Sequence, residues 1–249
     1  MSLIFIITIL NTSAQNKIIS NKRCFYFYPT STYNNIIFHE YYVLSYSEKD
    51  EQAEWVAYKM TDKNFEGIAK RKNNFKADKK VTTESAQLYD YKGSGYDRGH
   101  LAPAGSMKMN ETSMSESFYM SNMSPQKPSF NRGIWKRLEN KVRYWTEYND
   151  SLFVVTGPIL DNPLGAIGNN KVTIPRAYYK TLLGYKNGKA KGLAFIMPNE
   201  KSDLSLYKFV VSINDVEEIT KIDFYHKIDK NIQKEVEANK DVKLWFIGR

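Results

Sequence analysis

Cysteine and histidine are both scarce in this chain of 249 residues, and their scarcity excludes several kinds of site. The single cysteine, Cys24, rules out an internal disulfide, so the fold must depend on its hydrophobic core. It also rules out a cysteine-rich metal centre. Of the three histidines, His39 and His226 have no acidic or amide partner at obvious metal-ligand spacing, which favours a surface or packing role for both. The sequence leading to His100, in contrast, places an acid, an arginine and a glycine in direct succession.

Long hydrophobic runs are missing as well. The run Leu3–Leu10 is far shorter than the roughly 20 residues that span a bilayer. Small polar residues follow it, which is typical of a signal peptide cleaved near Ala14 or Gln15, although no Lys or Arg precedes the run. A buried amino-terminal strand is the alternative. The sequence therefore predicts a signal peptide over residues 1–15, a secreted or periplasmic protein, and no stable membrane association after cleavage.

Positive charge and aromatic side chains are plentiful. Lysine and arginine number 36 against 27 aspartates and glutamates, a net charge of +9. Such an excess favours polyanionic partners, because each phosphate that a cation neutralises releases bound counterions. Hydrophobic residues make up 42% and aromatic residues 14% of the chain, enough for a substantial core. Without a repeat or a low-complexity linker, residues 16–249 are expected to form one domain.

The patterns along the chain are typical of an α+β fold. Aromatic and β-branched residues dominate 23–47 and apolar residues fill 151–160, as in strands. Asn187-Gly188 is a strong hairpin signal, so 177–199 is expected to be two strands joined there. Residues 51–61 fit either a short strand or a helical turn. The other segments are a charged surface loop over 70–80, a central helix over 130–148 and a helical tail over 214–239. Together they predict a largely antiparallel sheet with helices.

The central helix carries two polar residues on or beside its buried face. Its apolar residues share one stripe at about 100° per residue: Ile134, Trp135, Leu138, Val142 and Trp145. Asn131 projects near the middle of that stripe, and Glu139 lies on its flank. Each needs a partner, because an unpaired buried polar group costs roughly 1–3 kcal/mol. The simplest explanations are a helix cap for Asn131 and a salt bridge for Glu139. The alternative is that both residues belong to one functional site.

The residues around this helix and the Asp97–His100 segment are of the types that phosphodiester hydrolysis needs. A neutral His100 imidazole can take a proton from water, and the Arg98 guanidinium suits a phosphate. An amide oxygen such as that of Asn131 suits Mg²⁺, which keeps several waters and often takes only one or two protein ligands. Glu139 can hold a metal-bound water. Spacing alone does not show that these residues meet.

Taken in order, the motifs resemble the DNA/RNA non-specific endonuclease family, which includes secreted bacterial nucleases and mitochondrial endonuclease G. The Asp-Arg-Gly-His signature over 97–100 matches in full. So do Asn-Met-Ser-Pro-Gln over 122–126, Asn-x-Gly-x-Trp-x-x-Leu-Glu over 131–139 and Val-Val-Thr-Gly-Pro over 154–158. The resemblance covers roughly residues 40–249. It implies a ββα-metal (His-Me finger) core within a larger, largely antiparallel sheet flanked by helices, in which two strands and a helix bring His and Asn to one ion.

The resemblance implies a role for each matching residue. His100 is expected to be the general base that activates water, and Arg98 to bind the phosphate and stabilise its developing charge. Asn131 is expected to be the direct Mg²⁺ ligand. Glu139 is expected to position a metal-bound water and to help protonate the leaving 3′-oxygen. Asn122 is expected to hold His100 or a metal-bound water in place.

Two further positions have less certain correspondences. Asp97 is expected to be structural, with its carboxylate packed into the turn that aims His100. The family also places a phosphate-binding arginine ahead of the signature, and in "KRKNNFKADKK" that role falls to Arg71 or Lys72. Arg71 is preferred, since a guanidinium can bind a phosphate through two bonds whereas an ammonium is a point charge. A solvated basic loop is the alternative.

The sequence thus predicts a Mg²⁺-dependent endonuclease that cleaves DNA and RNA with little sequence preference, with Mn²⁺ or another divalent ion able to substitute. One alternative is a catalytically silent nucleic-acid-binding protein of the same fold. Another is a hydrolase of a different phosphodiester. The oligomeric state is left open between monomer and homodimer.

Overall fold

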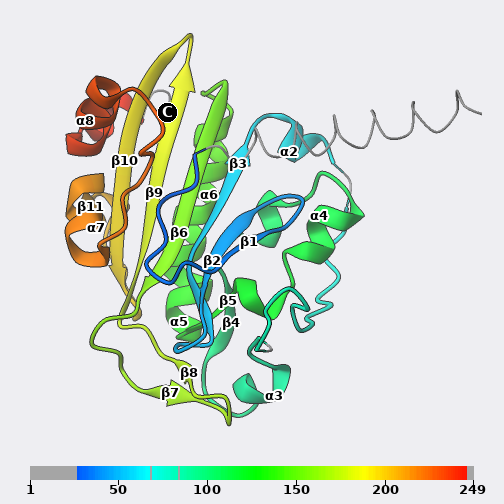
Figure 1. The fold of residues 1–249 in the computed structure, drawn as a ribbon. Helices are drawn as coiled ribbons and strands as arrows, with labels where there is room; N and C mark the ends of the chain where they lie inside the picture. Colours follow the sequence, from blue (N-terminus) through cyan, green and yellow to red (C-terminus); the bar gives the residue numbers. More distant parts are fainter. Residues whose placement is uncertain (1–26, 68, 84, 246–249) are drawn as a thin grey trace, which may run out of the picture.

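The computed structural model describes residues 27–67, 69–83 and 85–245, and at its centre lies a seven-stranded sheet (Figure 1). The strand order is β1-β2-β3-β6-β9-β10-β11, and every neighbouring pair is antiparallel. The strands are β1 Ile36–Phe38, β2 Val43–Ser47, β3 Gln52–Met60, β6 Ser151–Ile159, β9 Ala177–Lys186, β10 Lys189–Pro198 and β11 Val210–Val211. The prediction of a largely antiparallel sheet is confirmed.

Local sequence accounts for most of these strands. The segment 51–61, which fits either a strand or a helical turn, is the buried strand β3. The hairpin predicted around Asn187-Gly188 joins β9 to β10. Both turn residues have positive φ, 50° and 74° respectively, as the tight hairpin turn that matches the twist of the strands requires.

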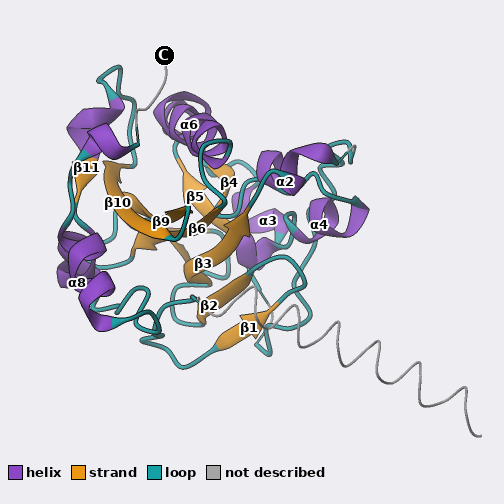
Figure 2. Ribbon diagram, turned by 90° about the horizontal axis from the view of Figure 1, so that it is seen from above, coloured by secondary structure: helices purple, strands orange, loops and turns teal. Residues whose placement is uncertain are grey.

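Helices cover both faces of the sheet (Figure 2). The helix α6 (Lys136–Thr146) packs on one face, while α7 (Ile213–Thr220) and α8 (Lys230–Ala238) pack on the other. Because successive residues of a strand point to opposite faces, Leu182 belongs to the core under α6 and Leu183 to the core under α7 and α8. The sheet therefore separates two hydrophobic layers.

The central helix is interrupted at its beginning. Residues Pro128–Phe130 form α5, a π-turn follows over Asn131–Trp135, and the regular helix α6 continues from Lys136. The backbone leaves helical geometry at Gly133. The five apolar residues of the predicted stripe are all buried, which confirms the inward face of the helix: Ile134, Trp135, Leu138, Val142 and Trp145. Single-turn π-bulges are frequent at functional sites, and Asn131 begins this one.

A separate pair of short strands precedes this helix. Strands β4 (Asp97–His100) and β5 (Met123–Gln126) pair antiparallel, with His100 opposite Met123. The segment Asp97–His100, which was expected to be a turn, is therefore an extended strand that pairs with β5 through backbone hydrogen bonds. Together with α5 and α6 it forms the ββα unit, so the predicted α+β fold with a ββα core within an antiparallel sheet is confirmed.

The remaining elements are short and connect these layers. They are α2 Lys63–Glu66, α3 Leu88–Tyr91, α4 Glu111–Glu116, β7 Ala166–Ile167, β8 Val172–Thr173 and 3₁₀ turns at Ala104–Ser106, Met120–Asn122, Leu206–Phe209 and Val242–Leu244. The charged segment 70–80 is a loop, as expected, and the helical tail is divided into α7 and α8. The predicted signal peptide lies outside the described residues. Within the described part, every helix is too short or too polar to cross a membrane.

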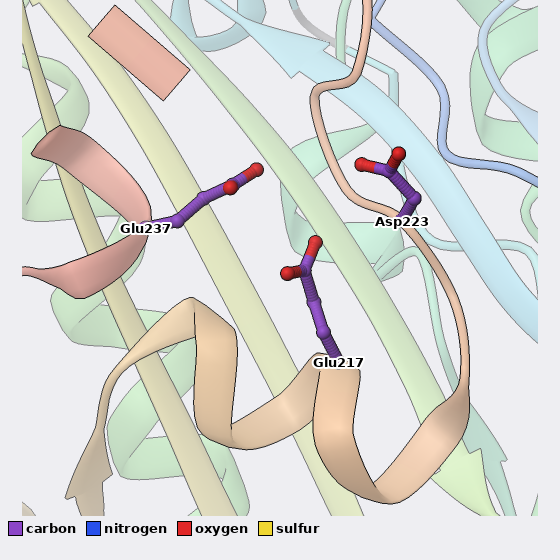
Figure 3. A group of neighbouring side chains, drawn as sticks. All are labelled: Glu217, Asp223 and Glu237. Atoms are coloured by element: carbon purple, nitrogen blue, oxygen red, sulfur yellow. The ribbon is translucent and has the colours of Figure 1, made fainter. Parts of the chain in front are cut away.

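Three carboxylates gather beneath α7 and α8, on the face of the sheet opposite α6. Figure 3 shows Glu217, Asp223 and Glu237 pointing toward one another, and their oxygens lie within 4.8 Å. Gln233 donates hydrogen bonds to Asp223 and Glu237, each at 2.9 Å. Burial, followed by the charges of Glu217 and Asp223, raises the pKa of Glu237 to about 7, against the opposing effect of the Gln233 hydrogen bond and of Lys230.

Glu237→Gln is expected to stabilise the protein at neutral pH but not in mild acid. The Glu237 carboxyl ionises near 4.5 in the unfolded chain and near 7 in the folded one. Between these values the folded state binds the proton more tightly, so stability falls as the pH rises through this window. Removing the charge should raise the free energy of unfolding by about 1 kcal/mol above pH 7 after solvent screening, which corresponds to ~2–4 °C in melting temperature. Near pH 4.5 it should leave the free energy of unfolding unchanged. Thermal melts at both pH values measure this.

The matched control is Glu235→Gln on the exposed side of α8. Its effect on the melting temperature should be small and the same at both pH values. An equal gain for Glu237→Gln at both pH values would show that charge repulsion does not set the stability of this region.

Candidate active site

A cavity of about 1410 Å³ opens beside β4 and α6. Six cationic side chains line it, against two carboxylates, Asp97 and Glu139. The cations are Arg71, Lys92, Arg98, Arg132, Lys136 and Arg143. An excess of positive charge in a concave site attracts and concentrates polyanions. Of the seven residues expected at the site, six line this one cavity: Arg71, Asp97, Arg98, His100, Asn131 and Glu139.

His100 ends strand β4, and its imidazole is 8% exposed. The rings of Phe118 and Phe75 pack against it, with centroids 4.9 and 5.8 Å away. No described residue forms a hydrogen bond with its Nε2 atom. Its hydrogen bond to the backbone of Arg98 therefore involves Nδ1. A carbonyl can only accept, so Nδ1 carries the proton and Nε2 keeps a free lone pair.

The charge state of His100 follows from the same surroundings. Burial, and then the positive charges of Arg71 and Arg98, lower the pKa of its imidazole to about 3, although the backbone hydrogen bond acts in the opposite direction. The ring is therefore neutral at physiological pH, which is the form that can accept a proton.

Gly99 allows β4 to lie close to β5. A Cβ atom at this position would come within 2.2 Å of the Gln126 side chain. The glycine thus leaves room for the buried Gln126 side chain, which would have to move if a larger residue stood at position 99.

Asp97 connects β4 to the π-turn of the central helix. Its carboxylate accepts a hydrogen bond from the Asn131 amide nitrogen at 2.8 Å and two from the Arg132 guanidinium at 2.6 and 2.8 Å. The expected structural role of Asp97 is supported, but its partners are on the helix rather than in a turn around His100. Because Nδ2 of Asn131 is engaged, the amide is held in one orientation. Its Oδ1 receives no hydrogen bond from the described residues, so an oxygen ligand suited to a hard cation is available.

Glu139 lies on α6, eight residues beyond Asn131, and lines the same cavity. Burial raises the pKa of its carboxyl, whereas the charges of Lys180, Arg143 and Arg71 lower it. The expected salt bridge for Glu139 is absent among the described ion pairs, so its negative charge is balanced by several cations at longer range.

The positions of Arg71 and Lys72 favour Arg71 as the cation near the site. The Arg71 guanidinium lies 5.1 Å from the centre of the Phe118 ring and lines the cavity. Lys72 pairs with Glu111 and does not line the cavity. The Arg98 guanidinium stacks 4.2 Å from the Phe75 ring, so the two rings that enclose His100 also position both arginines.

Comparison with known proteins agrees with this geometry. The model of the family described as DNA/RNA non-specific endonuclease matches residues 19–231. Nuclease C1 of Cunninghamella echinulata var. echinulata is 36% identical over 208 residues, covering 76% of this chain and 82% of that protein. Mitochondrial Endonuclease G of Caenorhabditis elegans is 33% identical, covering 88% of this chain and 76% of that protein. The solved EndoG/EndoGI complex matches with a TM-score of 0.71 and 32% identity, covering 78% of this chain and 87% of that one.

The chain belongs to the DNA/RNA non-specific endonuclease family. It is a nuclease and therefore a hydrolase, and the family is metal-dependent and acts on nucleic acids.

The secreted or periplasmic location predicted from the sequence is wrong. Several relatives are mitochondrial nucleases, among them Endonuclease G of Caenorhabditis elegans and EXOG of Homo sapiens. The prediction depended on the run Leu3–Leu10, which lacks the preceding basic residues of an export signal. A short apolar run without that flank does not specify export.

Asn122 does not hold the His100 ring in this endonuclease. Its side chain is fully buried and bonds only to backbone: Oδ1 accepts from the Ala102 amide, and Nδ2 donates to the carbonyls of Ala102 and Ser117. Its own carbonyl accepts from the amide of Leu101, the residue after His100. Asn122 therefore fixes the backbone that leaves β4 and contacts neither the imidazole nor the cavity.

Only Arg71 and Arg98 were identified from the sequence among the basic residues of the site, and Arg143 and Lys180 in particular were missed. Arg143 lies one helical turn after Glu139, lines the cavity and has a buried Nη1 without a hydrogen-bond partner in the described residues. Lys180, on β9, is fully buried, with its Nζ donating to the Thr156 hydroxyl and lying 4.8 Å from the Trp135 ring. Burial lowers the pKa of Lys180, and the charge of Glu139 opposes this. Two sequence features could have pointed to these residues: an arginine four positions after Glu139, and a single lysine within an apolar strand.

The other expectations concern packing. His39 is a satisfied core histidine, as expected, with its Nε2 2.8 Å from the Asp78 carboxylate. His226 is half-buried on the opposite face of the sheet from the cavity. The methionines near the site are packing residues, and four are buried: Met107, Met114, Met120 and Met123.

Asp97→Asn is expected to weaken the metal site. An asparagine would place an amide nitrogen against the donors of Asn131 or Arg132, so the Asn131 amide would lose its fixed orientation. Loss of such an outer partner typically costs ~10–100-fold in metal affinity. Calorimetric titration with Mg²⁺ measures the affinity, and the exposed Asp161→Asn is the matched control. Unchanged affinity in Asp97→Asn would show that Asp97 does not position the ligand.

Proposed function

We propose that this endonuclease hydrolyses phosphodiester bonds in both DNA and RNA, with little sequence preference and with Mg²⁺ as its metal; Mn²⁺ or another divalent ion can substitute. The observation that carries the proposal is the buried, neutral His100 ring, which has an Nε2 without a partner in the described residues and lines a cavity with six cationic side chains. We also propose that residues 16–249 constitute one endonuclease domain.

His100 acts as the general base. Its Nε2 accepts a proton from a water molecule, and the water oxygen attacks the phosphorus. A new P–O bond forms while the bond to the 3′-oxygen breaks. The leaving 3′-oxygen takes a proton from a water that Glu139 holds, and the proton on Nε2 is later released to solvent. One product then carries a phosphate and the other a hydroxyl. The neutral state of the ring makes it available for this transfer throughout the physiological pH range.

The arginines stabilise the charge that develops on the phosphoryl oxygens. Arg71, Arg98 and Arg143 line the cavity from three different segments, so they can approach the phosphoryl group from more than one side. Two of them are held against aromatic rings, which limits the reorganisation needed when charge develops.

The donor set fits a hydrated divalent cation. Asn131 would hold Mg²⁺ through Oδ1, and Glu139 would hold one of its waters. When bound, Mg²⁺ supplies positive charge beside the leaving oxygen. When protonated, Lys180 lowers the pKa of Glu139 against the effect of burial, which favours the carboxylate form of that residue.

The absence of sequence preference follows from the kind of contact that the cavity offers. Its cations bind phosphates, which are the same at every step of the polymer. The position of the phosphate relative to His100 is set by these contacts, whatever bases flank it.

His100→Ala is expected to lower cleavage of both plasmid DNA and RNA by at least ~100-fold in the presence of Mg²⁺, because the general base is lost. Wild-type protein should degrade both polymers with Mg²⁺ and neither with EDTA. His226→Ala, which removes a histidine outside the cavity, is the matched control and should retain wild-type activity.

Three outcomes would contradict the proposal in different ways. Full activity of His100→Ala would exclude His100 as the base. Cleavage in EDTA would exclude the metal. Binding of nucleic acid by the wild type without cleavage under any divalent ion would favour a silent binding protein.

A further inference from the structure

Two large apolar side chains lie exposed at the edge of the active-site cavity. Leu88 and Tyr89, on the short helix α3, are 43% and 55% exposed, and both line the same cavity as His100. Neither is needed in the hydrophobic core. An exposed aromatic ring at the edge of a positively charged cavity offers a binding surface for a flat apolar group, because every nucleobase has a π-face that can stack on it.

The tyrosine ring is held in place before any ligand binds. The Tyr89 hydroxyl accepts a hydrogen bond from Asn170 at 3.2 Å. The neighbouring Asp90 is 1% exposed, and its carboxylate accepts from the backbone amide and the side-chain amide of Asn170, at 3.1 and 3.0 Å. A Cβ atom at Gly168 would come within 2.3 Å of Asp90, so α3 and the β7–β8 hairpin are closely packed. Tyr89 is therefore presented on a rigid support, which lowers the entropic cost of stacking.

The cavity is large enough to hold more than the phosphodiester that is cleaved. Its volume of about 1410 Å³ exceeds the roughly 300–1,000 Å³ typical of pockets for drug-sized ligands. Lys92, three residues after Tyr89, lines it together with Arg98, so the cavity that holds the exposed ring also holds cations. A nucleic acid carries charged phosphates and flat bases, and this cavity offers a group suited to each.

We propose that Tyr89, with Leu88 beside it, forms a stacking subsite for an unpaired nucleobase of the strand whose phosphodiester lies at His100. This inference rests on the proposed function and adds a specificity determinant to it. A base within a duplex has both faces covered by its neighbours, so this subsite accepts a base only from a single strand or a strand end. It favours single-stranded DNA and RNA over duplex at this position, without a preference for any one base.

The test is a double-mutant cycle that removes the ring and the base separately. Full-length His100→Ala protein, in Mg²⁺, is titrated against fluorescently labelled oligothymidylate and against an equally long oligomer of abasic tetrahydrofuran nucleotides. Adding Tyr89→Ala should weaken binding of oligothymidylate by about tenfold or more, as for other bases stacked on aromatic side chains. It should change binding of the abasic oligomer by less than ~2-fold, because no base is present to stack.

Two further variants separate stacking from folding. Tyr89→Phe keeps the ring and should bind oligothymidylate within ~3-fold of the His100→Ala parent, even though the bond to Asn170 is lost. Tyr207→Ala removes an exposed tyrosine that does not line the cavity and should have no effect on either oligomer.

An equal loss on both oligomers, or no loss on oligothymidylate, would overturn the stacking subsite while leaving the nuclease function intact. A parent protein that binds neither oligomer, together with a wild type that cleaves neither DNA nor RNA, would overturn the proposed function and the subsite with it.

Discussion

The burial of one unpaired imidazole nitrogen is the constraint around which the active site is built. A buried polar atom without a partner costs roughly 1–3 kcal/mol, and the surrounding structure has to compensate for that cost. At His100 the compensation comes from packing against Phe75 and Phe118 and from the bond that Nδ1 makes to the backbone. These contacts fix the tautomer and leave Nε2 as the nitrogen with a free lone pair. Burial, and then the charges of Arg71 and Arg98, lower the pKa of the ring and keep it neutral.

The ββα unit places this histidine near the residues that hold a metal. Strand β4 presents Asp97 and His100 three residues apart, and Asp97 reaches across to the π-turn, where it fixes the Asn131 amide. A regular helix from Pro128 onward would place Asn131 differently on the helix surface. The π-turn and the non-helical backbone at Gly133 are therefore part of the site's geometry. The sheet beneath α6 contributes Lys180, a buried basic side chain that interacts electrostatically with Glu139. Rigid elements on three sides therefore support one set of functional groups.

The ordered motifs were sufficient to predict the family, the ββα core and six residues that line one cavity. What they could not supply were partners that come from distant segments. The ring of Phe118 encloses His100 only because the chain at Lys76 pairs with Tyr119, a contact between two loops that no local pattern reveals. The family resemblance implied that Asn122 holds His100 or a metal-bound water, yet the hydrogen bonds of its side chain all go to backbone atoms. Lys180 was hidden within a strand, where alternation predicts burial but says nothing about which charge lies opposite. The predicted export failed for a different reason, because a short apolar run is compatible with more than one destination.

The protonation state of His100 can be measured directly by ¹⁵N NMR of its ring in the full-length, metal-free protein, with the signal assigned by its loss in His100→Ala. From about pH 8 to about pH 4, the account predicts a neutral ring with its proton on Nδ1, because its pKa of about 3 lies below this range. Titration near 6.5, the ordinary value for a solvated histidine, would contradict it. A proton on Nε2 would contradict it as well, because that nitrogen would then have no free lone pair to accept a proton from water.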